Sequence, residues 1–221
     1  MKINIVKLGL TEYAHALAIQ ERLLQLRQNN ETGDTLLLVE HPPVLTMGRR
    51  AKAENVIVSE QALSAIGVKV FEVSRGGDVT YHGPGQIVGY PIMDLNDHGR
   101  DIKVFVRKME DVFIRLLDKE YGITAHREEN KYTGVWVGEE KITAIGIAVK
   151  HWVTMHGFAF NVNTNLEHFR WINPCGITDR GVTSLKKLTG NAQDMDKLYD
   201  MVADYFCDVF NLEPVADEVE L

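Results

Sequence analysis

The sequence predicts an α+β fold in which a largely antiparallel sheet is covered by helices. Three strand-like segments, residues 132–137, 141–149 and 153–162, are separated only by tight turns, which is typical of an antiparallel meander. Before them, apolar residues recur every three or four positions over residues 102–117, with Asp101 as a capping residue and Gly122 beyond the end. This pattern predicts an amphipathic helix. We expect that helix to cover one face of the sheet.

The N-terminal part of the chain predicts a strand, a helix and a second strand. Ile3 and Ile5 alternate with polar residues, as in a strand that is buried on one face. Leucines and good helix formers fill residues 13–27, and the polar run NNETGD ends this helix. Residues 35–40, TLLLVE, form a short apolar run that is typical of a central strand.

The next segment should leave the sheet in a fixed direction. His41 precedes two prolines, and the residue before a proline is restricted to extended conformations. We expect this segment to bring Arg49, Arg50 and Lys52 to the surface. Such a cluster of cations is either a solvated face or a docking surface, and the sequence leaves both interpretations open.

The remaining elements are predicted from caps and periodicity. Ser59 caps a short helix that Gly67 ends, and strands over residues 68–74 and 86–92 flank a glycine-rich segment. Residues 163–183 show no periodicity, which indicates a functional or disordered segment, but Phe169 and Trp171 favour order. A last helix is expected from Asp194 to about residue 209. The acidic tail, residues 212–221, is expected to fray.

Length and composition narrow the class of protein. The 221 residues are 45% hydrophobic, enough for one core, so we expect a single domain over residues 1–221. The net charge of −7 disfavours nucleic acid and anionic membranes as partners. The alternating N-terminal pattern leads us to expect no signal peptide, and no apolar run approaches the ~20 residues that span a bilayer. Cys175 and Cys207 are the only cysteines, so a reducing, cytoplasmic location is expected.

The most unusual segment is RGGDVTYHGPGQ, residues 75–86, which lies between two apolar runs and holds four glycines. Glycine costs backbone entropy on ordering, so such a segment needs a reason to exist. One reason is that its backbone approaches a ligand closely, as loops of binding sites do. The alternative is a long hairpin loop without function.

Cys175 is the candidate nucleophile. It lies between a proline and a glycine and outside any apolar stripe, although a loop cysteine can also be inert. A thiol needs a nearby cation or base to react at neutral pH. Lowering its pKa by about 1.5 units takes roughly 2 kcal/mol, and one ammonium group about 4 Å away supplies about 4 kcal/mol before desolvation costs. Lys141, at the start of a predicted strand, is a candidate for that cation, or else a solvated hairpin lysine.

The sequence gives little support for a second reactive cysteine, a metal site or a nucleotide-binding site. Cys207 follows Phe206 on the last predicted helix and is interpreted as a packing residue. No pair of histidines has the spacing of metal ligands, and His151 and His156 would fall on opposite faces of a strand. Phosphate-loop and dinucleotide-binding motifs are absent. We therefore expect neither a metal nor a cofactor.

Four segments together resemble the lipoyl(octanoyl) transferase family. They are EHPPVLTMGRR, RGGDVTYHGPGQIVGY, GEEKITAIGI with its continuation HWVTMHGFAFNVN, and INPCGITDRGVTSL, and they span about residues 36 to 185. The resemblance implies the fold of biotin and lipoate protein ligase catalytic domains, a mixed, largely antiparallel sheet covered by helices. It also implies a cytoplasmic acyltransferase that passes an octanoyl (or lipoyl) group through a cysteine thioester.

The resemblance further implies roles for individual residues. Cys175 would be the nucleophile, Lys141 would lower its pKa and act as acid and base, and His82 would orient Lys141 or the thioester carbonyl. Backbone N–H groups near Cys175 and Gly176 could hold the oxyanion. Small residues in the strands are expected to leave room for the acyl chain. The residues expected to line the substrate pocket are Arg75, Gly76, Gly77, Asp78, Val79, Thr80, Tyr81, His82, Ala144, Ile145, Gly146, Gly157, Phe158 and Ala159.

This chain departs from the family's pattern at two positions. Thr143 stands where a small apolar residue is common, and His151 stands before Trp152 where arginine is common. Histidine at position 151 lacks the fixed positive charge of arginine, so other basic residues must receive an acidic carrier protein. Our hypothesis is a docking patch made of Arg49, Arg50, Lys52 and Lys150.

The resemblance also implies the partners of a monomer. The donor would be octanoyl-acyl carrier protein, and the acceptors would be lipoyl domains of 2-oxoacid dehydrogenase E2 subunits and the glycine cleavage H protein. The main alternative is an ATP-dependent lipoate-protein ligase on the same fold. A catalytically silent binding protein and a cysteine hydrolase are further alternatives.

Overall fold

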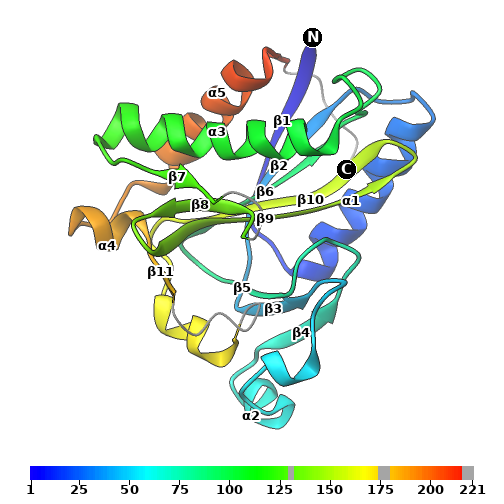
Figure 1. Ribbon diagram of the computed structural model, residues 1–221. Helices are drawn as coiled ribbons and strands as arrows, with labels where there is room; N and C mark the ends of the chain where they lie inside the picture. The colour runs from blue at the N-terminus through cyan, green and yellow to red at the C-terminus, as the bar shows by residue number, and fades with distance from the viewer. Residues whose placement is uncertain (129–131, 174–179, 216–221) are drawn as a thin grey trace.

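The computed structural model describes residues 1–128, 132–173 and 180–215, and its centre is one large mixed sheet (Figure 1). Within these residues nine strands form the sheet, in the order β12-β1-β2-β6-β10-β9-β8-β7, with β11 paired to β9. The strands are β1 (Lys2–Leu10), β2 (Thr35–Glu40), β6 (Gln86–Ile92), β7 (His126–Arg127), β8 (Gly134–Val137), β9 (Glu140–Lys150), β10 (Val153–Asn161), β11 (Gly181–Val182) and β12 (Glu213–Val215). The pairs β1–β2, β1–β12 and β9–β11 are parallel and the others antiparallel. The predicted meander is confirmed.

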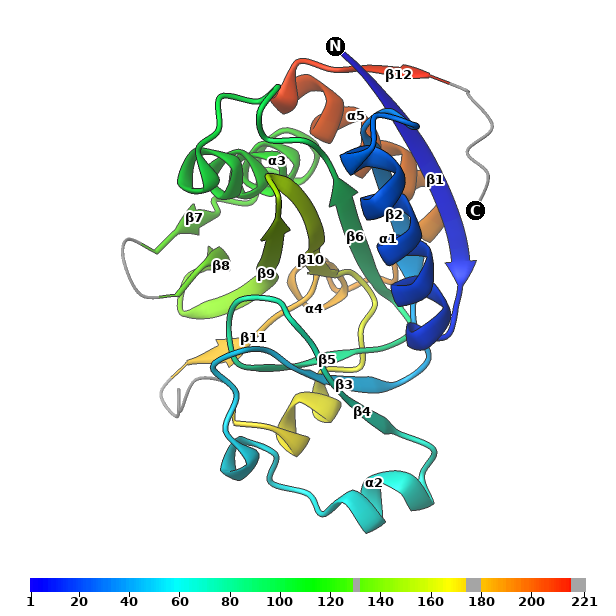
Figure 2. The ribbon, with the colours of Figure 1, turned by 90° about the vertical axis from the view of Figure 1, so that its right-hand side faces the viewer.

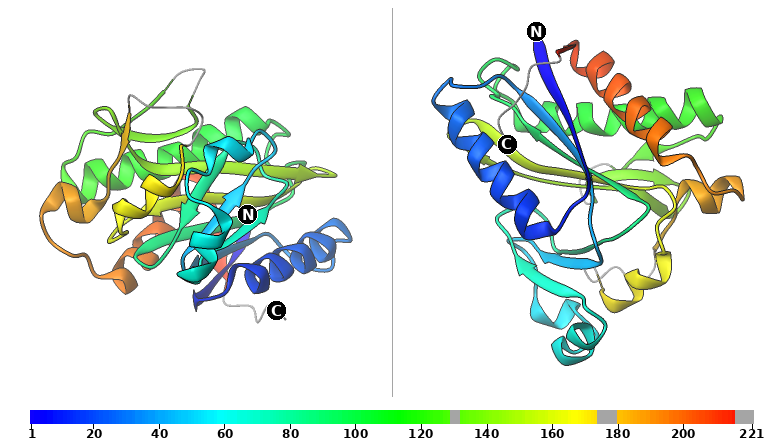
Figure 3. Two further views of the ribbon diagram at one scale, coloured as in Figure 1. Left: turned by 90° about the horizontal axis from the view of Figure 1, so that it is seen from below. Right: turned by 180° about the vertical axis from the view of Figure 1, so that it is seen from behind.

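Helix α1 (Tyr13–Gln28) connects the parallel strands β1 and β2 and covers one face of the sheet. Parallel neighbours need such a crossover, because their ends lie at opposite edges of the sheet. Ala16, Leu23 and Leu24 of the helix pack against the apolar side chains of β2, β6 and β10. Seen from below, the sheet lies between α1 and α3 (Figure 3).

Helices α3 (Ile102–Tyr121) and α5 (Met195–Phe210) cover the opposite face. The side chain of Asp101 accepts hydrogen bonds from the amides of Lys103 and Val104, and Gly122 ends α3 with φ +62°. A left-handed residue at this position lets the last carbonyls find amide partners, and glycine adopts it without steric cost. With helices on both sides, β6 and β10 are buried along their whole length.

A second, three-stranded sheet lies below the large one (Figure 2). It contains β3 (Val44–Met47), β4 (Lys69–Glu72) and β5 (Val79–His82), and it packs with α2 (Glu60–Ala65) and the short helices η1 (Ala53–Asn55) and η2 (Leu166–Trp171). The segment with the two prolines therefore does leave the large sheet, and Arg49, Arg50 and Lys52 are exposed, as expected. The interpretation of residues 75–85 as a loop is corrected, because Val79–His82 pairs with β3. The alternating Val, Thr, Tyr and His side chains favour a strand there.

The C-terminal region differs from the expected frayed tail. After α4 (Leu185–Thr189) and α5, strand β12 pairs with β1, and Leu212 is buried. The parallel edge of β1 offers unpaired backbone groups, which the Glu213–Val215 segment satisfies. The rest of the predicted tail, residues 216–221, lies outside the described residues. None of the helices in the described part of the chain has the length and apolar character needed to cross a bilayer.

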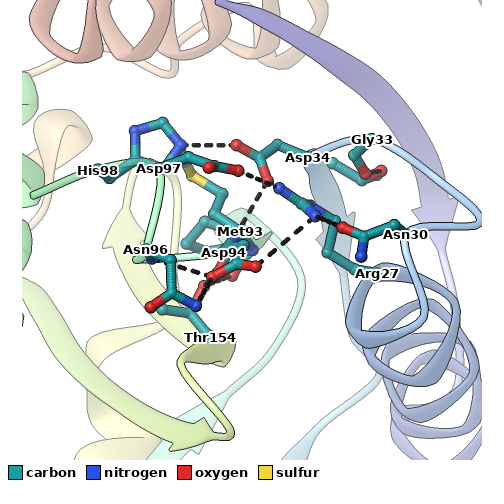
Figure 4. Close-up of polar contacts among 12 residues, drawn as sticks. Arg27, Asn30, Gly33, Asp34, Met93, Asp94, Asn96, Asp97, His98 and Thr154 are labelled. Carbon is teal, nitrogen blue, oxygen red and sulfur yellow. Dashed lines mark hydrogen bonds and ion pairs between the residues drawn. The ribbon is translucent and has the colours of Figure 1, made fainter. Parts of the chain in front are cut away.

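An ion cluster, buried at Arg27 and Asp34, joins α1 to the loop that follows β6 (Figure 4). The guanidinium of Arg27 contacts Asp34 at 2.8 Å, Asp97 at 2.6 Å and Asp94 at 3.7 Å. Nε2 of His98 lies 2.6 Å from the other carboxylate oxygen of Asp34. Burial alone would raise the pKa of Asp34, but the hydrogen bonds from His98, Arg27 and the Asp94 amide hold it below its usual value. Removing one member should therefore leave buried charges without partners.

We expect Asp34→Asn to lower the free energy of unfolding by roughly 3 kcal/mol, because it removes the charge that Arg27 was buried against. Since the folded pKa of Asp34 is depressed, its contribution is present above the unfolded pKa of about 4 and is lost as pH falls through the folded pKa. Urea titration at about pH 7 and pH 3 measures both effects.

The matched control is Asp208→Asn, which breaks the exposed Arg115–Asp208 contact of 3.2 Å. Exposed pairs contribute little, so this variant should change stability by less than about 0.5 kcal/mol. The role of the cluster would be contradicted if both variants lost the same free energy of unfolding. It would also be contradicted if the difference between Asp34→Asn and the wild-type protein were as large at pH 3 as at pH 7.

Candidate active site

A pocket of about 1080 Å³ lies between the two sheets. Its lining includes residues of β6, β9 and β10 of the large sheet, β5 and the residues before it, and chain segments around η2 and β11. Typical small-molecule pockets measure about 300–1,000 Å³, so this one has room for an elongated ligand. The pocket has both apolar and charged lining residues.

Most residues predicted for the site line this pocket. They are Arg75, Gly76, Gly77, Asp78, Val79, Thr80, His82, Lys141, Ala144, Ile145, Gly146, Gly157, Phe158 and Ala159. Cys175, the predicted nucleophile, and Gly176 lie outside the described residues. Tyr81 is the exception among the described ones.

Tyr81 points away from the pocket. Its ring is fully buried among Phe169, Trp171 and His168, and its hydroxyl lies 2.8 Å from Nδ1 of His168. Because β5 is a strand, successive side chains point to opposite sides, so Thr80 and His82 face the pocket and Tyr81 faces the small core. The family resemblance implied a pocket position for Tyr81, but its side chain does not line this pocket.

Two glycines of the site serve close packing of the backbone. The amide of Gly76 donates to the carbonyl of Ile147 at 2.8 Å, and a Cβ on Gly146 would come within 2.7 Å of the Gly76 oxygen. A Cβ on Gly157 would come within 2.1 Å of the Gly89 oxygen. The expectation that small residues leave room for a ligand is therefore corrected for these two, whose missing side chains admit neighbouring backbone.

A β-bulge turns Lys141 toward the pocket. Between β8 and β9, Val135 pairs with Thr143 and Trp136 pairs with Lys141, so β9 carries one extra residue there. Directly paired residues point to the same face of a sheet. Ala144 pairs with Gly134 and Lys141 pairs with Trp136, two residues further along β8, so Ala144 and Lys141 lie on the same face. Without the extra residue they would lie on opposite faces. Bulges commonly redirect a side chain next to an active site.

The surroundings of Lys141 are aromatic and cationic. Its ammonium donates to the carbonyl of Thr133 at 3.2 Å and lies 4.8 Å from the ring centroid of Trp136. The guanidinium of Arg180 lies 5.2 Å from the same ring and pairs with Glu128 at 2.6 Å. Cation–π contacts hold a charged group near a pocket without neutralising it. Two cationic side chains therefore lie at this end of the pocket, and one of them, Arg180, is paired with a carboxylate.

Both ends of the chain that flank Cys175 are anchored at the pocket. Asn173 lines it and donates its amide to the carbonyl of Asn55 at 2.7 Å. Arg180 lines it too, and Val182 pairs with Lys141 in the parallel β9–β11 ladder. Cys207, by contrast, is buried in the core between the sheet and α3 and α5, where burial raises the pKa of its thiol. Its interpretation as a packing residue is confirmed.

Arg75 is a buried cation at the edge of the pocket. Its guanidinium donates to the carbonyl oxygen of Thr46 at 2.7 Å, to the Thr46 hydroxyl at 2.9 Å and to the Gly76 carbonyl at 3.1 Å. These bonds keep the planar group in one orientation. It can therefore present a fixed positive charge to a ligand in the pocket.

The pocket's histidines are neutral. Burial lowers the pKa of His82 to about 3 and that of His156 to about 4, and the positive charge of Arg75 contributes in both cases. His41, behind His82, has its pKa lowered to about 4 by burial. None of these rings carries charge near neutral pH, so the lasting positive charge comes from arginine and lysine.

Sequence reasoning missed several residues that line the pocket. Asn161 and His156 are polar side chains within the fully buried strand β10, and Arg180 follows the segment that contains Cys175. A polar residue in an otherwise apolar buried strand signals a hydrogen-bond partner or a site. This signal was present in HGFAFN for both.

The chain resembles proteins with known functions. The family model described as "Lipoyl protein ligase A/B catalytic domain" matches residues 12–207. Octanoyltransferase of Caldicellulosiruptor saccharolyticus is 65% identical over 95% of this chain and 89% of its own length, and that of Desulforamulus reducens is 60% identical over 100% and 97%.

Solved structures share the fold at low identity. A lipoate-protein ligase A bound with ATP has a TM-score of 0.78 and 16% identity, covering 99% of this chain and 90% of its own. The biotin protein ligase from Aquifex aeolicus in complex with biotin and ATP has a TM-score of 0.57 and 15% identity, covering 95% and 70%. The expected fold class, a mixed and mostly antiparallel sheet with helices, is confirmed.

Gly146→Ala tests the close approach of the two sheets. The added Cβ would meet the Gly76 oxygen at 2.7 Å, so the segment before β5 must shift, and we expect a loss of about 1–3 kcal/mol. Thermal unfolding measures it. Gly33→Ala is the control, because its Cβ would have only one neighbour, at 3.8 Å. Unchanged stability of Gly146→Ala would show that the sheets do not lie this close.

Proposed function

The chain belongs to the lipoyl protein ligase A/B catalytic-domain family, and we infer that it is an octanoyltransferase of protein lipoylation. As an acyltransferase, it moves an octanoyl group onto a protein. The observation that supports this function best is the pocket, in which Arg75, Lys141 and the flanks of Cys175 meet beside an apolar wall. The donor, the acceptor and the route of the acyl group are proposals that we argue below.

The reaction that we propose has two transfers. The thiolate of Cys175 attacks the thioester carbonyl of octanoyl-acyl carrier protein, and the tetrahedral intermediate expels the carrier's thiolate, which takes up a proton. The ε-amine of a lysine on a lipoyl domain then attacks the new thioester, loses a proton and releases Cys175. Each transfer exchanges one bond to the acyl carbon for another, so the reaction needs neither a redox partner nor ATP.

The chain around Cys175 supports its role. The described residues on either side of it in the sequence, Asn173 and Arg180, both line the pocket. Lys141 lines the same pocket. An ammonium group near a thiol favours the thiolate and can later return a proton to the leaving group.

The wall beside these groups suits a saturated chain. Val88, Ala144 and Ala159 line the pocket from β6, β9 and β10, and their direct pairing puts them on one face of the sheet. Burying a methylene stabilises binding by about 0.8 kcal/mol. An eight-carbon chain would gain several kcal/mol from this wall, which is enough for a preference in length.

Acidic carrier protein would dock at the basic rim, which we define as Arg49, Arg50 and Lys150. All three are exposed, and Arg50 lines the pocket. The charges of Arg49 and Lys150, far apart in sequence, both lower the pKa of His156, so both side chains lie near it. Lys52, also in our hypothesis, is paired with Glu54 at 3.3 Å and would contribute less.

The ligase alternative is disfavoured. Relatives that are 60–65% identical to this chain are named octanoyltransferases, whereas the ATP-bound ligase shares the fold at 16% identity. Such a ligase would need an ATP site and no cysteine. Dependence of the reaction on ATP therefore separates the two functions, and partitioning of the acyl group to water would reveal a hydrolase.

Incubation with octanoyl-acyl carrier protein, without ATP, should add the mass of one octanoyl group to the wild-type protein, on the peptide that contains Cys175. Cys175→Ala should abolish this adduct. Lys141→Met should slow its formation by at least about 10-fold near neutral pH, because the thiol would lose the cation that favours its ionised form.

Cys207→Ser is the matched control for this experiment, because Cys207 is a core residue. It should form the adduct at the wild-type rate. Adduct on Cys207, full transfer by Cys175→Ala, or strict dependence on ATP would each overturn the proposed mechanism.

Charge reversal at the basic rim should weaken donor binding. For Arg49→Glu combined with Arg50→Glu, we expect KM for octanoyl-acyl carrier protein to rise about 10-fold or more at low salt, and less in high salt, where charges are screened. Lys119→Glu, an exposed α3 residue outside the pocket lining, is the control and should leave KM unchanged. The same KM in both variants at all salt concentrations would exclude this docking surface.

A further inference from the structure

A line of hydrogen bonds connects several buried polar residues at the pocket. We call it the polar chain and define it as Arg75, Thr46, His82, Gln86 and Asn161. Gln86, Asn161 and His82 are at most 6% exposed, and all three line the pocket. Buried polar groups at such positions are costly unless they are paired. The pairing of these residues therefore defines how each side chain is oriented.

Gln86 sets the direction of the polar chain. Its amide nitrogen donates to the Tyr81 carbonyl at 3.2 Å and to Oδ1 of Asn161 at 2.9 Å. Both hydrogens of the amide are then used, and the amide oxygen faces Nδ1 of His82 at 2.8 Å. An amide oxygen can only accept, so the hydrogen of the neutral imidazole lies on Nδ1.

The contacts of Nε2 of His82 are consistent with a hydrogen on Nδ1. Its Nε2, which carries no hydrogen, lies 3.5 Å from the Thr46 hydroxyl. That hydroxyl accepts from Nε of Arg75 at 3.3 Å and from Nη2 at 2.9 Å. Its own hydrogen is therefore available to His82, and the donors run in one direction from Arg75 to Gln86.

Asn161 extends the line of hydrogen bonds toward Lys141. Its amide nitrogen donates to the Thr183 carbonyl at 3.1 Å, and the Thr183 amide donates to the carbonyl of Lys141 at 3.0 Å. Val182, the residue before Thr183, pairs directly with Lys141. Asn161 thus holds the strand that follows the Cys175 segment against the strand that carries Lys141.

We propose that Gln86 and Asn161 are positioning residues of the acyl transfer, which hold His82 as a fixed link in its Nδ1–H form and keep β11 in register beside Lys141. His82 then links the Arg75 side of the pocket to the Lys141 side and does not act as a general base. This inference rests on the proposed function for its link to catalysis, but the hydrogen bonds can be tested without activity.

The electrostatics of the pocket favour a neutral His82. Burial is the main reason that its pKa falls to about 3, and the nearby His41, Arg75 and His156 lower it further, against the Gln86 hydrogen bond, which raises it. A ring in this state cannot take a proton near neutral pH. Its constant tautomer makes it suitable as a fixed link.

The first test is NMR of imidazole nitrogens in ¹⁵N-histidine-labelled protein, with His82 assigned by the loss of its signals in His82→Gln. We expect the neutral Nδ1–H form from about pH 5 to 8. Gln86→Glu should move the titration of His82 to higher pH, because a carboxylate facing Nδ1 stabilises the imidazolium. A ring with its hydrogen on Nε2, or one that titrates in this range in the wild-type protein, would overturn the proposal.

The second test is the kinetics of Asn161→Asp, which keeps the shape but cannot donate to Thr183 when ionised. We expect kcat for octanoyl transfer to fall on the order of 10²-fold near neutral pH with KM for the carrier protein nearly unchanged, as misplacement of reacting groups does. A protonated carboxyl can donate again, so kcat of this variant relative to the wild-type protein should recover as pH falls. A positioning role would be contradicted if KM rose while kcat stayed at the wild-type value. It would also be contradicted if the relative kcat of the variant did not recover at low pH.

Asn4→Asp is the matched control. Asn4 is equally buried but lies on β1, outside the pocket lining, so this variant should lose stability and keep the wild-type kcat and pH profile. An equal fall in kcat in both variants would show that stability, not positioning, is affected. If the wild-type protein transfers no octanoyl group, the proposed function fails, whereas the His82 spectrum still decides between a fixed link and a titrating base.

Discussion

The site depends on one backbone contact between the two sheets, the hydrogen bond from the Gly76 amide to the Ile147 carbonyl. It is possible only because Gly146 has no side chain where the Gly76 carbonyl approaches. The contact brings the residues before β5 to β9, and the pocket is the space that remains beside it. Arg75, in the segment between β4 and β5, and Lys141, on β9, line one pocket for this reason.

The charges of the pocket follow from burial. Removing a titratable group from water disfavours its charged form, and His41, His82 and His156 all have depressed pKa values. Arginine stays charged even when buried, and the side chain of Arg75 is held by three oxygen acceptors. An anionic nucleophile or oxyanion would therefore meet fixed cations in a pocket whose histidines add hydrogen bonds but no charge.

The buried polar residues also separate stability from function. The Arg27–Asp34–His98 cluster ties α1 to the loop after β6, away from the pocket. The polar chain lies at the pocket and joins strands of both sheets. In the ion cluster and in the polar chain, buried polar groups are paired by hydrogen bonds. Of these two groups, the polar chain is the one with residues that line a cavity that a substrate could enter.

The sequence by itself determined the elements, because helix and strand periodicity and capping residues act locally. The long helices, the meander and the cap at Asp101 were predicted within a few residues. The described residues that the family resemblance implied for the site line the pocket, Tyr81 excepted, but they make up less than half of its lining. The octanoyl transfer itself was predicted through the same resemblance.

Only the tertiary structure decided which side chains face the pocket. The bulge that turns Lys141 to the face of Ala144 depends on pairing with β8, and the burial of Tyr81 depends on the strand pairing of β5 with β3. The pairing of β12 with β1 depends on an open sheet edge. Each of these is a contact between residues far apart in sequence, which no local pattern records, because the free energy that selects it arises only when the sheets assemble.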